Sequence, residues 1–137
     1  RPDYAPALNN VGAIVEAAGR FEEALNWYVR SGQSDPSYAL AHRNTAGIYI
    51  RLQRWQAAEA SARSALSAHP QYGAAWNLLA AALFRQGKLS DAAAAFERAA
   101  AIEPTQAAFQ NLALAYGTLG DKAKAQAAAQ TAARLSP

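Results

Sequence analysis

Apolar residues recur at helical spacing in two consecutive segments between Gly73 and Pro104. The apolar positions are Trp76, Leu79, Ala80 and Leu83 in the first segment, and Leu89, Ala92, Ala93, Phe96, Ala99 and Ala100 in the second. Gly87 separates the two segments and Pro104 ends the second, and glycine and proline are the residues that most often interrupt helices. The pattern therefore predicts two antiparallel helices joined by a short turn.

The rest of the chain repeats this unit at a fixed spacing. Pro2, Pro36, Pro70 and Pro104 are each 34 residues apart, and Pro137 follows after 33. The same step relates Ala24, Ala58, Ala92 and Ala125, and also Gly19, Gln53, Gly87 and Gly120. A fixed period of this length is typical of stacked-repeat proteins, in which each unit packs only on its neighbours.

A 34-residue unit of two helices resembles the tetratricopeptide repeat (TPR) family. The positions that carry the resemblance in the best unit are Trp76, Leu79-Ala80, Leu83, Ala92, Phe96, Ala99 and Pro104. The resemblance implies an all-α fold, a right-handed superhelical α-solenoid of antiparallel helix pairs. We expect a single domain, 1–137, with repeats at about 5–38, 39–72, 73–105 and 106–137.

Two glycine-related positions modify this expectation. Gln53 stands where the other units have glycine, so we expect the turn there to find its left-handed residue elsewhere or to bend differently. Gly32 falls late in the second helix of the first unit, so we expect that helix to end or fray early.

In the second unit His42 occupies the position that Trp76 holds in the third, which indicates a packing residue. Phe21, Trp55 and Leu89 are expected to be core residues beside the turns.

The chain starts and stops at repeat joints and has no methionine, which suggests an internal fragment of a longer array. Its many alanines, 38 in all, and its excess of arginine over lysine, 10 against 3, are typical of a bacterial gene of high GC content. Solenoids need polar capping units, and none is visible. We therefore expect possible end-to-end self-association of the excised fragment.

Composition narrows the chemistry. The absence of cysteine excludes disulfides and thiolate metal sites and leaves the compartment open between periplasm and cytoplasm. The longest apolar run, Leu78 to Phe84, is too short to span a bilayer, so no direct membrane insertion is expected. No catalytic motif is recognisable, and the sequence suggests neither an enzyme nor a cofactor or metal site.

The positive charge of the chain, +3 in all, is concentrated in the second unit. That unit has one acidic residue, Glu59, and four arginines: Arg43, Arg51, Arg54 and Arg63. This asymmetry indicates either a basic patch or a solvated helix face. Such weak electrostatics give no reason to expect nucleic acid as a partner.

The family resemblance places a concave groove on the first helix of each pair. The positions implied are Pro6, Asn9, Asn10, Ala13, Glu16 and Ala17; Leu40, Arg43, Asn44, Gly47, Ile50 and Arg51; Ala74, Asn77, Leu78, Ala81, Phe84 and Arg85; and Ala107, Gln110, Asn111, Leu114, Gly117 and Thr118. Our candidate ligand-binding residues within this set are Asn9, Asn10, Arg43, Asn44, Arg51, Asn77, Arg85 and Asn111. The amides could hold the backbone of an extended peptide, or could equally bond neighbouring repeats. The arginines could pair with carboxylates.

The two-carboxylate clamp of the co-chaperone members of the family is absent. That clamp requires Lys and Asn four residues apart, then Asn, then Lys and Arg. Here Asn9 and Ala13 stand at the first pair, Asn44 fits the middle position, and Ala74 and Leu78 replace the last pair.

The sequence thus predicts a non-catalytic scaffold that binds a peptide or protein segment in its groove. By resemblance, such bacterial arrays belong to assemblies for exopolysaccharide synthesis or export, or for secretion. The alternatives are a substrate-presenting arm of a glycosyltransferase-type enzyme and a structural spacer between domains.

Overall fold

The computed structural model describes residues 4–135, and these residues form eight α-helices. The helices are α1 (Ala5–Ala17), α2 (Phe21–Ser34), α3 (Ala39–Arg51), α4 (Trp55–Ala68), α5 (Gly73–Arg85), α6 (Leu89–Ile102), α7 (Gln106–Leu119) and α8 (Lys122–Arg134). Pro2 and Pro137, the end members of the proline series, lie outside the described residues.

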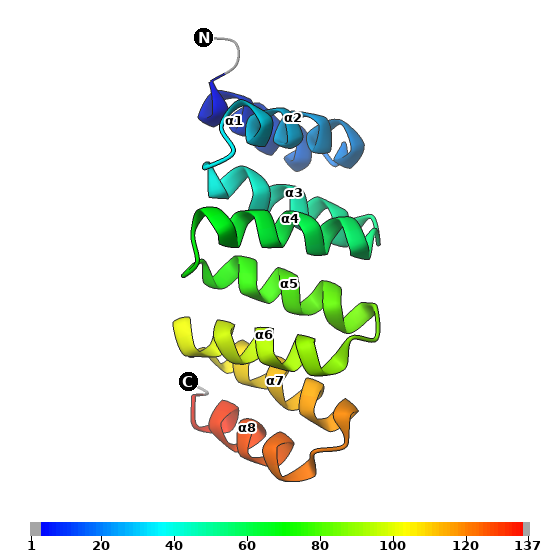
Figure 1. Cartoon of the computed structure of the whole chain (residues 1–137), viewed down its shortest axis with the longest axis vertical. Coiled ribbons are helices and arrows are strands. Elements are labelled where there is room, and N and C mark those ends of the chain that lie inside the picture. The colour runs from blue at the N-terminus through cyan, green and yellow to red at the C-terminus, as the bar shows by residue number, and fades with distance from the viewer. Residues whose placement is uncertain (1–3, 136–137) are drawn as a thin grey trace.

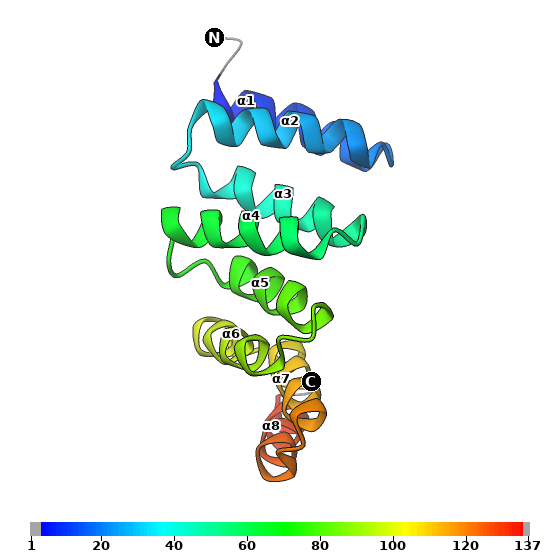
Figure 2. The same ribbon diagram turned by 45° about the vertical axis from the view of Figure 1, so that its right-hand side comes forward.

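The helices pair in chain order and the pairs stack along the long axis of the molecule (Figure 1). Each second helix also packs on the first helix of the next pair, and the first helices α1, α3 and α5 contact one another in sequence. Figure 2 shows that the last pairs, α5–α6 and α7–α8, are turned relative to the first ones, so the stack twists as it grows. The all-α solenoid of antiparallel helix pairs is confirmed.

Small side chains occupy the places where the helices come closest. Ala24, Ala58 and Ala92, one in each of α2, α4 and α6, are completely buried. Alanine is the best helix former and lets backbones approach closely, which increases dispersion contacts between helices. Larger side chains such as Tyr28 and Leu83 then fill the remaining space. The buried residues form two clusters: a small one of Ala24, Leu25, Tyr28 and Ile48, and a larger, alanine-rich one that includes Leu79, Leu83, Phe96 and Leu112.

All four turns within helix pairs contain one residue in the left-handed region. Gly19, Gly87 and Gly120 have φ of 80°, 80° and 85°, and Gln53 has φ of 59°. The expectation that this turn would find its left-handed residue elsewhere or bend differently is wrong, because Gln53 itself is left-handed. Gln53 keeps the hydrogen bonds of the glycine turns, because its N–H donates to Ile50 O and the next N–H donates to Tyr49 O. These bonds hold a side-chain-bearing residue in a conformation that favours glycine.

Helix α2 does not end early at Gly32, and this expectation is also wrong. The helix continues to Ser34, and Gly32 is buried. A Cβ atom on Gly32 would lie 2.9 Å from Cε1 of His42, so glycine makes room for that ring. His42 is a packing residue as predicted, and its Nε2 lies 2.9 Å from the carbonyl oxygen of Pro36. Trp76 Nε1 donates to Pro70 O at the same distance in the next unit.

A polar cluster joins the second and third helix pairs. Glu59 on α4 accepts hydrogen bonds from Gln86 Nε2 at 2.9 Å, Lys88 Nζ at 3.1 Å and Arg63 Nε at 3.0 Å. These donors, Gln86 first, lower the pKa of Glu59 from 4.5 to about 2 despite its partial burial. Because Gln86 and Lys88 belong to the turn after α5, the carboxylate ties one pair to the next.

Replacing Gln53 by glycine should stabilise the protein. We expect Gln53→Gly to raise the free energy of unfolding by about 0.5–1 kcal/mol, because it removes the left-handed penalty and keeps the turn hydrogen bonds. Urea denaturation measures the change. Ala60→Gly, at an exposed position in the interior of α4, is the control and should lower the stability by about 1 kcal/mol. A loss of stability in Gln53→Gly would contradict this account of the turn.

Removing the charge of Glu59 should destabilise the protein in a pH-dependent way. The folded-state pKa is lowered, so the stabilisation is present above pH 4.5 and is lost as the pH falls toward 2. We expect Glu59→Gln to cost about 2 kcal/mol at pH 7 and to differ little from the parent chain near pH 2. Glu23→Gln, which removes an exposed pair with Arg20 at 3.7 Å, should cost less than about 0.5 kcal/mol. An equal loss at both pH values would show that packing, not charge, is responsible.

Candidate functional site

Two adjoining hollows lie on the face formed by the first helices, and together we call them the groove. The central pocket, of about 320 Å³, is lined by Ile50, Arg51, Gln53, Trp55, Ala81, Phe84, Arg85, Phe96 and Leu114. The N-terminal pocket, of about 490 Å³, is lined by Ala13, Glu16, Ala17, Gly19, Phe21 and Arg51. Arg51 belongs to both, so the two pockets meet at the end of α3. Six lining residues of the central pocket and four of the N-terminal pocket come from the positions that the family resemblance implied.

Arg51 and Arg85 have the same environment one repeat apart. The guanidinium carbon of Arg51 lies 4.7 Å from the centre of the Phe21 ring, and that of Arg85 lies 4.4 Å from the Trp55 ring. Within residues 4–135 neither guanidinium forms an ion pair with a carboxylate. Stacking on an aromatic face fixes a guanidinium while leaving its N–H groups free to bind an acceptor.

Among the described residues, one carboxylate lines either pocket, and it is already bonded. Glu16 Oε1 accepts a hydrogen bond of 2.5 Å from the hydroxyl of Tyr28. Burial, together with this carboxylate, raises the pKa of Tyr28 well above its ordinary value. The phenol therefore stays neutral, and the charge balance of the two pockets, Glu16 against Arg51 and Arg85, is positive.

Three of the predicted residues form one network across the first joint. Asn44 Nδ2 donates to Asn9 Oδ1 at 3.0 Å, and Arg43 Nη1 donates to Asn44 Oδ1 at 2.9 Å. Asn9 is buried, with 4% of its surface exposed. This geometry favours the structural alternative for Asn9 and Asn44, in which they bond neighbouring repeats.

The other predicted amides are not brought together. Asn10 and Asn111 are exposed, and Asn77 is half-buried on α5. The Oδ1 atom of Asn77 is buried and has no hydrogen-bond partner among the described residues. Asn77 holds the repeat position of Asn9, and Asn111 holds that of Asn44, yet no hydrogen bond joins them across residues 4–135.

Phe21 and Trp55 were expected to be core residues, but they are half-buried and line the groove. A signal for this was present in the sequence, because an arginine follows each of them after 30 residues, at Arg51 and Arg85. Leu89, the third member of this set, has Thr118 near the equivalent place and no such arginine. At this repeat position the described residues thus form an aromatic–arginine pair at the first two joints, and both arginines line the central pocket.

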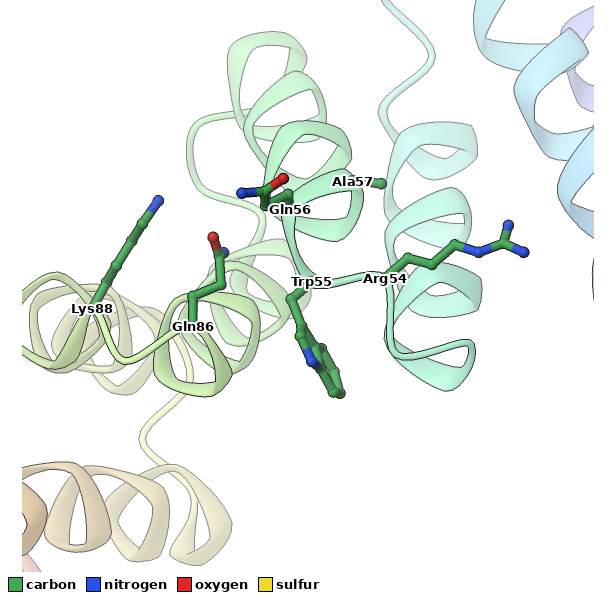
Figure 3. A pocket seen from close by; sticks show the side chains of 6 residues that line it. All are labelled: Arg54, Trp55, Gln56, Ala57, Gln86 and Lys88. Atoms are coloured by element: carbon green, nitrogen blue, oxygen red, sulfur yellow. The ribbon is translucent and has the colours of Figure 1, made fainter.

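A third hollow, of about 660 Å³, lies at the turn edge between the second and third pairs (Figure 3). Its lining residues are Arg54, Trp55, Gln56, Ala57, Gln86 and Lys88. In Figure 3 the amide ends of Gln56 and Gln86 face each other, while Arg54 extends away from them. Arg54 pairs with Glu22, and Gln86 and Lys88 bond Glu59, so the charged groups of this hollow already have partners.

The described part of the chain contains no group of three His, Cys, Asp or Glu side chains that could hold a metal ion. Within the same residues, none of the helices has both the length and the apolarity needed to cross a bilayer.

Comparisons with known proteins agree with the repeat pattern. Family models described as tetratricopeptide repeat match residues 16–72, 45–107 and 107–137. RNA polymerase II-associated protein 3 of Homo sapiens is 30% identical over 86 residues, which are 63% of this chain and 13% of that protein. The TPR repeat-containing thioredoxin TTL4 of Arabidopsis thaliana is 39% identical over 51 residues, 37% of this chain and 8% of that protein. The chain thus spans only a small part of the curated relatives that it matches.

Two solved structures share the architecture. The crystal structure of MamA superposes with a TM-score of 0.91 at 22% identity, over 97% of this chain and 78% of that one. The first TPR of Spaghetti (RPAP3), bound to the HSP90 peptide SRMEEVD, gives a TM-score of 0.82 at 27% identity, over 85% and 93% of the two chains. The sequence repeats, the stacked helix pairs and the family models together show that the chain belongs to the tetratricopeptide repeat family.

Proposed function

We propose that this chain is a non-catalytic interaction scaffold that binds a segment of another protein in the groove on its first helices. It acts as one domain of four repeats, at about 5–38, 39–72, 73–105 and 106–137. The observation that carries the proposal is the pair of guanidinium groups, Arg51 and Arg85, that border an open apolar pocket without carboxylate partners. A charged group held in place beside an apolar hollow is suited to a ligand that supplies the opposite charge.

The network of Asn9, Arg43 and Asn44 supports a backbone-binding role only in part. Asn44 already uses one donor and its acceptor within the protein. Asn10 and Asn111 are exposed and have more capacity for a ligand. The unpartnered Oδ1 of Asn77 is buried, so a ligand in the groove could use it only if this side chain turned outward.

The RPAP3 domain bound to an HSP90 peptide supports peptide binding as the mode of action. We do not extend that ligand to this chain, because Ala74 and Leu78 stand where the last cations of the two-carboxylate clamp belong. The proposed groove ligand is therefore recognised by Arg51 and Arg85 rather than by a clamp.

For the larger context we propose an assembly such as exopolysaccharide synthesis or export, or secretion, in a bacterial cell. This part of the proposal rests on composition and on resemblance to bacterial arrays, and the identity of captured partners tests it. A glycosyltransferase among the partners or in the same polypeptide would favour the substrate-presenting alternative. Complete absence of partners would favour the spacer.

Capture of partners from a lysate of the organism that carries the gene tests the function. We expect Arg51→Gln/Arg85→Gln to lose specific partners, because both free cations of the groove are removed. The matched control is Arg30→Gln/Arg98→Gln, which removes two arginines that also stack on aromatic rings, Trp27 at 4.8 Å and Trp76 at 5.1 Å, but do not line the groove. Mass spectrometry identifies the partners, and circular dichroism checks that each variant is folded.

Partners lost only in the groove variant would place binding in the groove. Partners retained by both variants would move binding elsewhere, and the groove arginines would then be stacking residues only.

We also propose that residues 1–137, when isolated, associate end to end. Ile14 on α1 is 71% exposed, whereas Ile48 and Ala82, its counterparts in the next two repeats, are 1% and 0% exposed because a preceding helix covers them. At the opposite end a hollow of about 310 Å³ opens between α7 and α8. Its lining residues are Phe109, Leu112, Tyr116, Lys124, Ala127, Ala128 and Thr131. Unpartnered apolar faces of this kind favour association.

Light scattering over a concentration series checks this. We expect the mean mass to rise with concentration in the parent fragment and to stay monomeric in Ile14→Glu. Leu114→Glu, which changes an exposed leucine in the groove, is the control and should associate as the parent does. A parent chain that remains monomeric at every concentration would contradict association through the apolar faces at its two ends.

A further inference from the structure

The central pocket combines an apolar wall with two stacked arginines. We propose that it selects an acidic protein segment that inserts one large apolar side chain between α3, α5 and α7 and presents carboxylates to Arg51 and Arg85. This inference rests on the proposed function and names the chemistry of its partner.

The shape of the pocket favours a single large apolar side chain. The apolar lining includes Ile50, Ala81, Phe84 and Leu114, and no carboxylate from residues 4–135 lines the pocket. Its volume of about 320 Å³ lies at the lower end of the range for small-molecule sites, so it has room for a leucine, phenylalanine or similar side chain together with part of the segment that carries it, rather than for a large cofactor. Leu114 is 60% exposed without a ligand, and burial of this surface would contribute to binding.

The arginines favour carboxylates close to that side chain. A guanidinium held on an aromatic face loses little additional freedom when it binds, and its planar edge can hold a carboxylate through two parallel hydrogen bonds. Arg51 also lines the N-terminal pocket, so a segment that leaves the central pocket along α1 would keep this contact. Among the described residues Glu16 is the one carboxylate that lines this pocket; it accepts a hydrogen bond from Tyr28 and forms no ion pair with Arg51.

The same contacts disfavour single-stranded nucleic acid. Proteins bind such strands by stacking bases on open aromatic faces beside a basic channel. Here the guanidinium groups of Arg51 and Arg85 already cover one face each of Phe21 and Trp55. The apolar lining of the pocket also offers nothing to a phosphate backbone.

Selection from a random 12-residue peptide library displayed on phage tests the proposal, with the whole chain as bait. We expect the selected peptides to share one leucine, phenylalanine or other large apolar residue with Asp or Glu near it. The selected peptides are then synthesised, and their affinities are measured by fluorescence polarisation. Arg51→Gln and Arg85→Gln should each weaken binding about tenfold, and raised salt should weaken binding to the parent chain.

A second variant tests the apolar pocket without changing charge. Ala81→Phe fills the pocket and should weaken the same peptides at least about tenfold. Ala94→Phe is the matched control, because Ala94 is an exposed alanine on α6 that lines neither pocket of the groove, and it should change the affinity less than about twofold.

The outcomes separate this inference from the proposed function. Peptides that bind in an Arg51- and Arg85-dependent way, but lack the apolar–acidic pattern or tolerate Ala81→Phe, would overturn the inference and keep the groove function. Failure to select any peptide, or selection of peptides indifferent to all groove variants, would overturn both. Displacement of the peptides by a 20-nucleotide RNA at comparable concentration would assign the arginines to phosphate binding and would also overturn the inference.

Discussion

Close approach of helices at small residues is the constraint on which the structure depends. Ala24, Ala58 and Ala92 have no exposed surface, and at each of these positions a larger side chain would push neighbouring helices apart. In the first repeat a glycine, rather than an alanine, allows the close approach. A Cβ atom on Gly12 would lie 2.7 Å from the ring of Tyr28, so glycine there allows a tyrosine where α4 has Ala62. Because each pair contacts only its neighbours, this constraint brings the first helices α1, α3 and α5 side by side, and the groove lies on the face that they form.

The sequence was sufficient to predict the fold because three independent patterns in it have the same period. The apolar spacing, the turn glycines and the joint prolines all indicate one unit, and the stacked helices follow from it. The errors concern single residues that depart from the repeat. Gln53 adopts the left-handed conformation itself, since the surrounding hydrogen bonds outweigh its local preference. Gly32 lies inside a continuous helix, and its lack of a side chain leaves the space that the His42 ring of the next repeat occupies. Local helix propensity does not reveal this contact between repeats.

The candidate site was harder to predict because a residue type does not fix a role. The pair of Asn9 and Asn44 recurs as Asn77 and Asn111, yet the first pair is hydrogen-bonded across its joint and the second is open, with Asn77 Oδ1 unpartnered. Periodicity alone cannot distinguish a bonded amide from an available one, because the difference depends on how far apart the helices lie. Phe21 and Trp55 were similarly interpreted as core residues, since the turn position says nothing about the arginine that covers each ring from the next repeat.

The central pocket itself arises from substitutions at equivalent positions in successive repeats. Ala81 leaves space on α5, while Leu114, its counterpart on α7, supplies the far wall. Ile50 and Phe84 share another repeat position and provide apolar surface, whereas Gly117, the next member, has no side chain to close the pocket. The repeat thus gives successive helices equivalent positions. Different residues at a few of these positions bring apolar surface together with two arginines that have no ion-pair partner among the described residues, at the middle of the groove. Because apolar surface and the two arginines occur together there, the proposed ligand would be selected at this place.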